Sequence, residues 1–205
     1  MAVTLTTPNT LLGAYQPKAA SAQLLANVVI VLLGTALITL AAKTNVPTWP
    51  VAVTLQSLAV AFLAAAFGWR IGVATVVAYL VEGAVGLPVF ATGGGLAYLV
   101  GPTGGFLIGF VLMAYIIGRA ADAGASGRVV ALAIAMLVAD AALFVLGFLW
   151  LLALGSSAAW LDQSNLLGSA FAKAVQPFLL WDALKMIFAA VTVAGAWTVL
   201  RKHDA

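Results

Sequence analysis

The stretch RVVALAIAMLVADAALFVLGFLWLLA, residues 128–153, is apolar throughout except for Arg128 and Asp140. Its apolar residues are continuous, whereas a membrane barrel strand would alternate apolar and polar positions. A hydrocarbon core of about 30 Å needs roughly 20 such residues for one crossing, and a helix satisfies its own backbone hydrogen bonds there. The stretch therefore predicts a membrane-spanning helix.

The composition extends this prediction to the rest of the chain. Hydrophobic residues make up 64% of the 205 residues and charged residues 7%, so the charged surface of a soluble domain is missing. The chain has no cysteine and a single histidine, which excludes disulfides, thiol chemistry and a Cys/His metal site. The composition therefore predicts an integral membrane protein. Our expectation is that it is not an enzyme and has no metal or cofactor.

The apolar stretches predict an all-α fold with six transmembrane helices in a single membrane domain, residues 22–205. The expected helices are 22–43, 52–67, 70–85, 103–121, 128–153 and 176–200. The second and third are short and separated only by the stretch GWR, so they should form a tight hairpin that does not cross fully. Residues 1–21 are expected to be a cytoplasmic N-terminal segment without a cleaved signal peptide.

Basic residues predict the orientation of the helices, because they concentrate on the cytoplasmic side. With an internal N-terminus, that side collects six of them: Lys18, Arg70, Arg119, Arg128, Arg201 and Lys202. The outside has only Lys43 and Lys173, so both termini are expected in the cytoplasm. The net charge of +3 is then a topology signal, and no basic stripe or recognition motif for nucleic acid accompanies it.

Ionisable residues within membrane helices are costly, so each needs a partner or a function. Asp182 and Lys185 are three residues apart and share one helical face, and Glu82 is expected at a similar depth. These three groups predict a polar pocket for a small ligand in the outer half of the membrane. In the structural alternative, Asp182 and Lys185 only neutralise each other, and Glu82 extends outward to the membrane surface. Asp140 is either a hydrogen-bonding group in helix packing or a protonated acid.

The stretch GLPVFATGGG, residues 86–95, is expected to lie over that pocket. Glycines 93 to 95 permit positive φ and a close approach of the backbone to a ligand, although they also suit an ordinary connector. Phe90 and Tyr98 flank them and are candidates for stacking on a ligand ring. The candidate substrate-binding residues are Asp182, Lys185, Glu82, Phe90, Thr92, Gly93, Gly94, Gly95 and Tyr98.

The second glycine-rich stretch, GPTGG at residues 101–105, reads as a turn that opens a helix, with Thr103 as its expected N-cap. It lacks the Gly-Lys-Ser/Thr ending of a phosphate loop. If transport is driven by ATP, a partner must therefore hydrolyse it.

Three other functions remain open on the residues alone. A proton-coupled secondary transporter of a small organic molecule would use Glu82 and Asp140 as protonation sites. An intramembrane aspartyl hydrolase could pair Asp140 with Asp182, but the glycine-flanked aspartates of such enzymes are missing. A purely structural membrane subunit would not need polar groups in the outer half.

Four segments together resemble the BioY family, the biotin-specific substrate-binding (S) components of energy-coupling factor (ECF) transporters. They are VTLQSLAV (53–60), YLVEGAVGLPVFATGGGLAYLVGPTGGFLIGF (79–110), VLGFLWL (145–151) and QPFLLWDALKM (176–186). In this resemblance, Asp182 and Lys185 match the polar pair of the family and residues 86–95 its substrate-covering loop. Where the family often has Pro-Gly-Asp, this chain has Leu180, Trp181 and Asp182.

The resemblance implies high-affinity capture of biotin from outside and its uptake into the cell. The implied partners are biotin, an ECF transmembrane coupling subunit and two cytoplasmic ATPase subunits, in the lipid bilayer of a prokaryotic cytoplasmic (inner) membrane. Ala22 and Ala26 have the AxxxA spacing that lets another helix approach closely, so they could form the coupling face.

Overall fold

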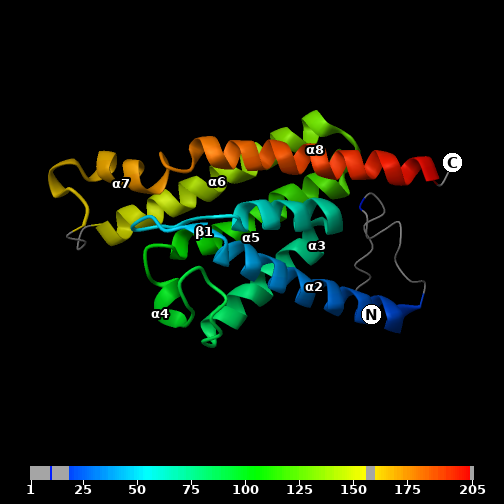
Figure 1. Ribbon diagram of the computed structural model, residues 1–205, viewed down its shortest axis with the longest axis horizontal. Coiled ribbons are helices and arrows are strands. Elements are labelled where there is room, and N and C mark those ends of the chain that lie inside the picture. The colour runs from blue at the N-terminus through cyan, green and yellow to red at the C-terminus, as the bar shows by residue number, and fades with distance from the viewer. Residues whose placement is uncertain (1–9, 11–18, 156–159, 204–205) are drawn as a thin grey trace.

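The apolar stretches of the chain form helices that lie side by side along the long axis of the molecule (Figure 1). In this computed structural model, the described residues are 10, 19–155 and 160–203. The helices are α2 (Ala20–Lys43), α3 (Gln56–Ala84), α4 (Leu96–Leu99), α5 (Gly104–Asp122), α6 (Val129–Gly155), α7 (Leu166–Ala174) and α8 (Leu179–His203). Two 3-10 turns, η1 (Ala125–Gly127) and η2 (Gln163–Asn165), precede α6 and α7, and β1 (Asn45–Val46) pairs antiparallel with β2 (Val53–Thr54).

The expected fold class, an all-α integral membrane protein, is confirmed. Five segments are long and apolar enough to cross a membrane: Ala20–Lys43, Gln56–Ala84, Gly104–Asp122, Val129–Gly155 and Gln163–Val199, the last of which joins η2, α7 and α8. Large apolar side chains, for example Leu24, Leu33 and Val130, are exposed on the outside of the bundle. Such a surface suits contact with lipid tails, which are as apolar as leucine.

Helix α3 consists of two segments joined by a sharp turn at Gly68, whose φ of 82° and ψ of 173° are not helical. Glycine adopts this positive φ readily because it has no Cβ. The two segments pack closely, since a Cβ at Gly72 would lie 3.0 Å from Ala64 Cα. At 1.5 Å per residue, residues 56–67 and 69–84 extend about 18 and 24 Å, less than a hydrocarbon core of about 30 Å. The structure therefore contains the expected short hairpin.

Several element boundaries differ from the expected ones. The second expected helix starts at residue 52, but Val53 and Thr54 form β2, because these β-branched residues pair across the hairpin with β1. The connection before the last helix contains α7, whose first turn is capped by Asn165. Helix α2 begins at Ala20 rather than at 22. Of the expected cytoplasmic segment 1–21, residues 1–9 and 11–18 lie outside the described residues.

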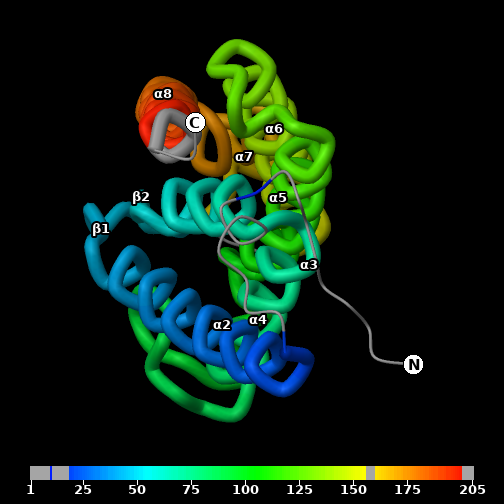
Figure 2. Tube along the Cα trace, turned by 90° about the vertical axis from the view of Figure 1, so that its right-hand side faces the viewer, coloured from blue at the N-terminus to red at the C-terminus, as the bar shows by residue number. Residues whose placement is uncertain are grey.

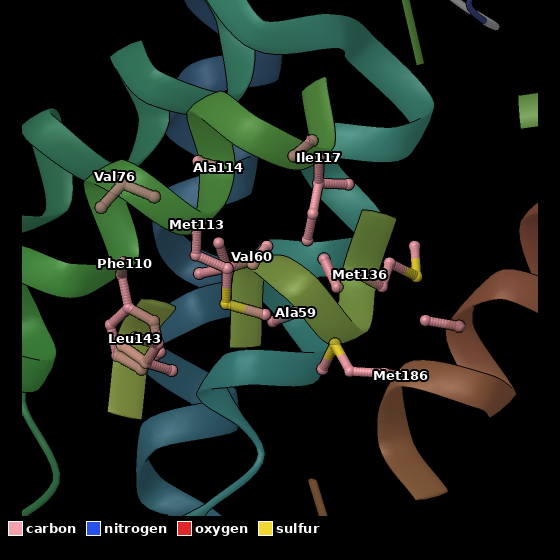
Figure 3. Close-up of a cluster of buried hydrophobic side chains, with 14 of the residues drawn as sticks. Ala59, Val60, Val76, Phe110, Met113, Ala114, Ile117, Met136, Leu143 and Met186 are labelled. Atoms are coloured by element: carbon pink, nitrogen blue, oxygen red, sulfur yellow. The ribbon is translucent and has the colours of Figure 1, made fainter. Parts of the chain in front are cut away.

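The core of the bundle is built around α5, which packs on α3 and on α6. Figure 2 shows α2 against α3, on the side of the molecule opposite α8. Apolar side chains from α3, α5, α6 and α8 meet in one buried cluster (Figure 3), which includes Val60, Met113, Ile117, Met136 and Met186. This cluster packs the four helices together and fixes the positions of side chains that lie between their ends.

The described basic residues are divided between the two ends of the bundle as the sequence predicts. The start of α2 and the end of α8 lie at one end (Figure 1). Gly127 beside Trp197 places η1 at that end, and Arg70 and Arg119 both act electrostatically on Asp122 nearby. Loop 86–95, which accepts a hydrogen bond from Lys43, and α7, which carries Lys173, lie at the other end. Lys18 lies outside the described residues, and the cytoplasmic placement of the termini stays a prediction.

Gly118 lies where α5 crosses the turn in α3. A Cβ at this position would collide with backbone atoms of Trp69, which cannot swing aside as a side chain could. We expect Gly118→Ala to lower the stability by about 1–3 kcal/mol, the usual cost of overpacking, as measured by thermal unfolding in detergent. Gly195→Ala on α8 is the matched control, because its Cβ would meet no atom within 4 Å. Equal melting temperatures for the two variants would contradict this close packing.

Candidate functional site

A cavity lies between β2, α3, α5, α6 and the start of α8, next to loop 86–95. Its atom-free space is about 550 Å³ with the opening included, which is within the range of small-molecule sites. The space open to the centres of water molecules is only about 50 Å³, so a two-ring ligand would have to displace lining side chains. The lining residues are Val51, Ala52, Thr54, Gln56, Ser57, Phe90, Ala91, Tyr98, Thr103, Phe106, Leu107, Phe110, Leu143, Phe144, Phe178, Asp182 and Lys185.

One wall of the cavity is polar and is centred on the carboxylate of Asp182. Ser57 Oγ donates a hydrogen bond of 2.6 Å to Asp182 Oδ1, and Lys185 Nζ lies 2.5 Å from the same oxygen. The Asp182 side chain is 5% exposed and that of Lys185 is 12% exposed, so the ion pair is largely removed from solvent. None of the described residues donates a hydrogen bond to Asp182 Oδ2, which leaves this oxygen for a donor on a ligand.

The ammonium group of Lys185 already has three acceptors around it. Besides Asp182 Oδ1, they are the Thr54 carbonyl oxygen at 2.8 Å and Ser57 Oγ at 3.3 Å. A lysine ammonium has three N–H donors, so a ligand oxygen would have to replace one of these acceptors. In this state Lys185 holds α8 against the start of α3 and neutralises Asp182.

A second polar chain on this wall connects Gln56 with the loop. Thr54 Oγ1 donates to Gln56 Oε1 at 3.1 Å, and Gln56 Nε2 donates to the Tyr79 hydroxyl at 2.9 Å. That hydroxyl in turn donates to the Val89 carbonyl oxygen at 3.1 Å. Because Tyr79 is fully buried, the chain fixes both the Gln56 side chain at the cavity and the loop above it.

The second wall of the cavity is apolar and aromatic. Phe178, just before α8, lies 6.1 Å from the rings of both Phe106 on α5 and Phe144 on α6. Phe110 and Leu143 continue this wall toward the buried cluster, where both are labelled in Figure 3. A ligand with an apolar face and a hydrogen-bonding edge would match the two walls.

Loop 86–95 contributes the ring of Phe90 to the lining at one end of the cavity. This ring is fully buried, stacks on Tyr98 with centroids 4.9 Å apart and meets Tyr79 edge-on at 5.4 Å. Lys43 Nζ donates to the Phe90 carbonyl oxygen at 2.6 Å, and Gly95 N–H donates to the Gly83 carbonyl oxygen at 2.7 Å. The loop is thus attached to both α2 and α3.

The glycines of this loop shape its own backbone. Gly95 has φ of 98°, a left-handed value that favours glycine. A Cβ on Gly94 would collide with the Leu87 carbonyl oxygen. These two positions allow the loop to fold back on itself and to place Phe90 in the cavity.

The predicted site residues fall into two groups. Phe90, Tyr98, Asp182 and Lys185 line the cavity. Glu82, Thr92 and the glycines 93–95 are not among the described residues that line it, so the structure does not bring Glu82 to the Asp182–Lys185 pair, and a role of these residues in binding stays a prediction. Tyr79 and Gly83 pack against Phe90. Glu82, three residues after Tyr79, lies close enough to act on Tyr79 electrostatically but is not part of the cavity lining.

Sequence reasoning missed the polar residues at the start of α3. Gln56 and Ser57 are buried in the first turn of that helix, at 5% exposure each. Two adjacent polar residues at the start of an otherwise apolar helix were the signal that could have identified them. Thr103 directly precedes α5, as an N-cap would, but its side chain makes no capping hydrogen bond and lines the cavity instead.

Two further features lie near the site: the residue before Asp182 and a second hollow. Trp181, which stands where glycine is frequent in the resembling family, is helical and 59% exposed, so it does not distort the backbone before Asp182. A second, more open hollow of about 1050 Å³ lies between the β1–β2 hairpin and the start of α8, and it shares Thr54 and Lys185 with the cavity. Lys185 therefore separates the two spaces.

The sequence is similar to one protein family and to several biotin transporters or probable biotin transporters. The model of the BioY family matches residues 14–202. The biotin transporter BioY of Thermotoga maritima is 47% identical over 89 residues, which are 43% of this chain and 53% of that protein. The probable biotin transporter BioY of Pyrococcus horikoshii is 30% identical over 165 residues, 79% of this chain and 90% of that protein. The match thus spans about half of the first relative and most of the second.

The fold has a counterpart of known structure. The crystal structure of the S-component for biotin from an ECF-type ABC transporter superposes with a TM-score of 0.69. The superposition covers 86% of this chain and 93% of that chain, at 24% sequence identity. At this level of identity the match establishes the fold, and the cavity has to be interpreted from its own residues.

Proposed function

Because this chain belongs to the BioY family, a family of transporters rather than enzymes, we propose that it captures biotin and takes part in its uptake across the membrane. The observation that carries the proposal is the cavity with one polar and one aromatic wall. Its position near the end of the bundle opposite the start of α2 and the end of α8 suits capture from outside. The named activity of the relatives supplies the choice of ligand.

The chemistry of biotin fits the two walls. Its fused rings offer apolar area, its ureido group has two N–H donors and one acceptor, and its valerate chain ends in a carboxylate. We assign a ureido N–H to Asp182 Oδ2, and we place the rings between Phe90, Tyr98 and the aromatic wall. Gln56 and Ser57 are available for the remaining polar groups of the ligand.

Uptake is proposed to need partners. In this reading the chain is the substrate-specific subunit of an ECF-type transporter, with a transmembrane coupling subunit and two cytoplasmic ATPase subunits, in a prokaryotic cytoplasmic membrane. The likeness in fold to an S-component supports this assignment. Ala22 and Ala26 are half-buried at the start of α2, beside its apolar exposed face, and remain the proposed contact for the coupling subunit.

Equilibrium binding of labelled biotin to the purified protein in detergent, without any ATPase, tests the proposal. We expect saturable binding with one site per chain, displaced by unlabelled biotin. A valerate compound without the ureido ring should not compete, because it has no donor for Asp182. Absence of biotin binding by protein that elutes as one folded species would refute the function.

A further inference from the structure

Asp140 is a buried acid that the biotin site does not use. It lies in the middle of α6 and is 5% exposed. Its Oδ1 is buried and has no hydrogen-bond partner in the described part of the chain. Met136, one turn before it, and Leu143, about one turn after it, point into the apolar cluster (Figure 3). A carboxyl group in such surroundings is costly in its ionised form.

The surroundings of Asp140 supply one cation and one further anion. Asp182 and Lys185 on α8 both act on it electrostatically. On α5, Gly105 and Gly109 meet Trp150 and Leu143, so the two helices run antiparallel. The ionisable groups of α5 consequently lie nearer to the start of α6 than Asp140 does. They are Tyr115, Arg119 and Asp122. Helix α7 carries Lys173 near its end, and η1 has no ionisable residue. Helix α3 contacts α6 only briefly, and none of its charged groups acts on Asp140.

The charge balance of this cluster is uneven if every group is ionised. The two carboxylates and one ammonium would leave one uncompensated negative charge in the membrane. Lys185 is already engaged by Asp182 at 2.5 Å, with Ser57 and the Thr54 carbonyl as its other acceptors. Asp140 therefore has neither a hydrogen-bond donor nor a cation of its own among the described residues.

We propose that Asp140 is a proton-binding site, which holds one proton at neutral pH and keeps the cluster with Asp182 and Lys185 electrically neutral. The proton takes the place of the missing donor or cation. Protonation of Asp140 matters for ligand binding because the cavity is next to it: Leu143, Phe144 and Asp182 line this cavity. Loss of the proton would place a second negative charge near Asp182, where it competes for Lys185.

Infrared spectroscopy of the purified protein without ligand tests the proton site independently of biotin. With ¹³C in the aspartate side chains, we expect a carbonyl band of a protonated carboxyl group that shifts with the label and is lost in Asp140→Asn. Asp122→Asn should retain the band, whereas Asp182→Asn, which leaves Lys185 free to neutralise an ionised Asp140, should weaken it. The labelled unmodified protein by itself is a second test if a variant does not fold. A spectrum with carboxylate bands and no acid band would overturn the proposal.

A binding experiment, which rests on the proposed function, tests the consequence. Biotin is an anion, so loss of the proton from Asp140 should weaken biotin binding. Above the pH at which Asp140 loses its proton, we expect the affinity to fall by up to tenfold per pH unit. Asp140→Asn, the neutral analogue of the protonated acid, should remove this dependence and retain the affinity seen at low pH. The same decline in both proteins, or a flat profile in the unmodified one, would overturn the link. If neither protein binds biotin, the proposed function fails and the infrared comparison alone decides the proton site.

Discussion

Replacement of Lys185 by alanine is expected to weaken biotin binding by a hundredfold or more. Removal of one partner of a buried ion pair costs on the order of 3–5 kcal/mol, because the other charge stays buried without compensation. The exposures of 12% for Lys185 and 5% for Asp182 place this pair in that category. The variant also loses the link from α8 to the Thr54 carbonyl and to Ser57, which holds the polar wall together.

Equilibrium binding of labelled biotin measures the effect, with thermal unfolding as the check that the variant is folded. Lys173→Ala on α7, a lysine that does not line the cavity, is the matched control and should bind as the unmodified protein does. In the double variant Asp182→Asn/Lys185→Ala the uncompensated charge is gone, so part of the lost stability should return while binding stays weak. An affinity of Lys185→Ala within about threefold of the unmodified protein would refute the role of the pair.

Replacement of Phe90 by alanine should have the second large effect, and on the empty protein as well as on binding. The ring is fully buried and contacts Tyr98 and Tyr79. A buried Phe→Ala change costs about 3–5 kcal/mol, because transfer energy is lost and a cavity remains. Stacked and edge-on aromatic contacts add to this cost. The loop should then lose its closed position, and biotin should dissociate faster.

Thermal unfolding and the dissociation rate of labelled biotin measure these effects. Phe171→Ala on α7 is the control, since that ring is 46% exposed and lies away from the cavity. We expect Phe90→Ala to melt well below both the control and the unmodified protein. Unchanged melting together with unchanged dissociation would show that the loop does not depend on this ring.

The helices were predictable because their signals are local. Continuous apolar stretches mark α2, α5, α6 and α8, and the stretch GWR marks the turn in α3. The short elements were not predictable in this way. β2 depends on its pairing with β1, and α7 is too short and too polar at its start to stand out from a connection.

The site was predictable only in part. Phe90 in loop 86–95 and Tyr98 in α4 were identified from their place beside glycines, and both line the cavity. Glu82 was grouped with Asp182 and Lys185 from its expected depth in the membrane, but depth does not specify the direction of a side chain. Ser57 was missed because its partner, Asp182, is 125 residues away in the chain.

By itself the sequence determined that this is a helical membrane protein, where most of its long apolar helices lie, and that Asp182 and Lys185 share one helical face. These properties follow from composition and from the fixed geometry of a single helix, in which residues three apart share a face. Only the tertiary structure decided that Ser57 and Thr54 complete this pair, that Phe90 enters the cavity and that Asp140 lies close enough to act on Asp182. Such contacts depend on how separate helices pack, and packing is a property of the whole chain rather than of any local stretch.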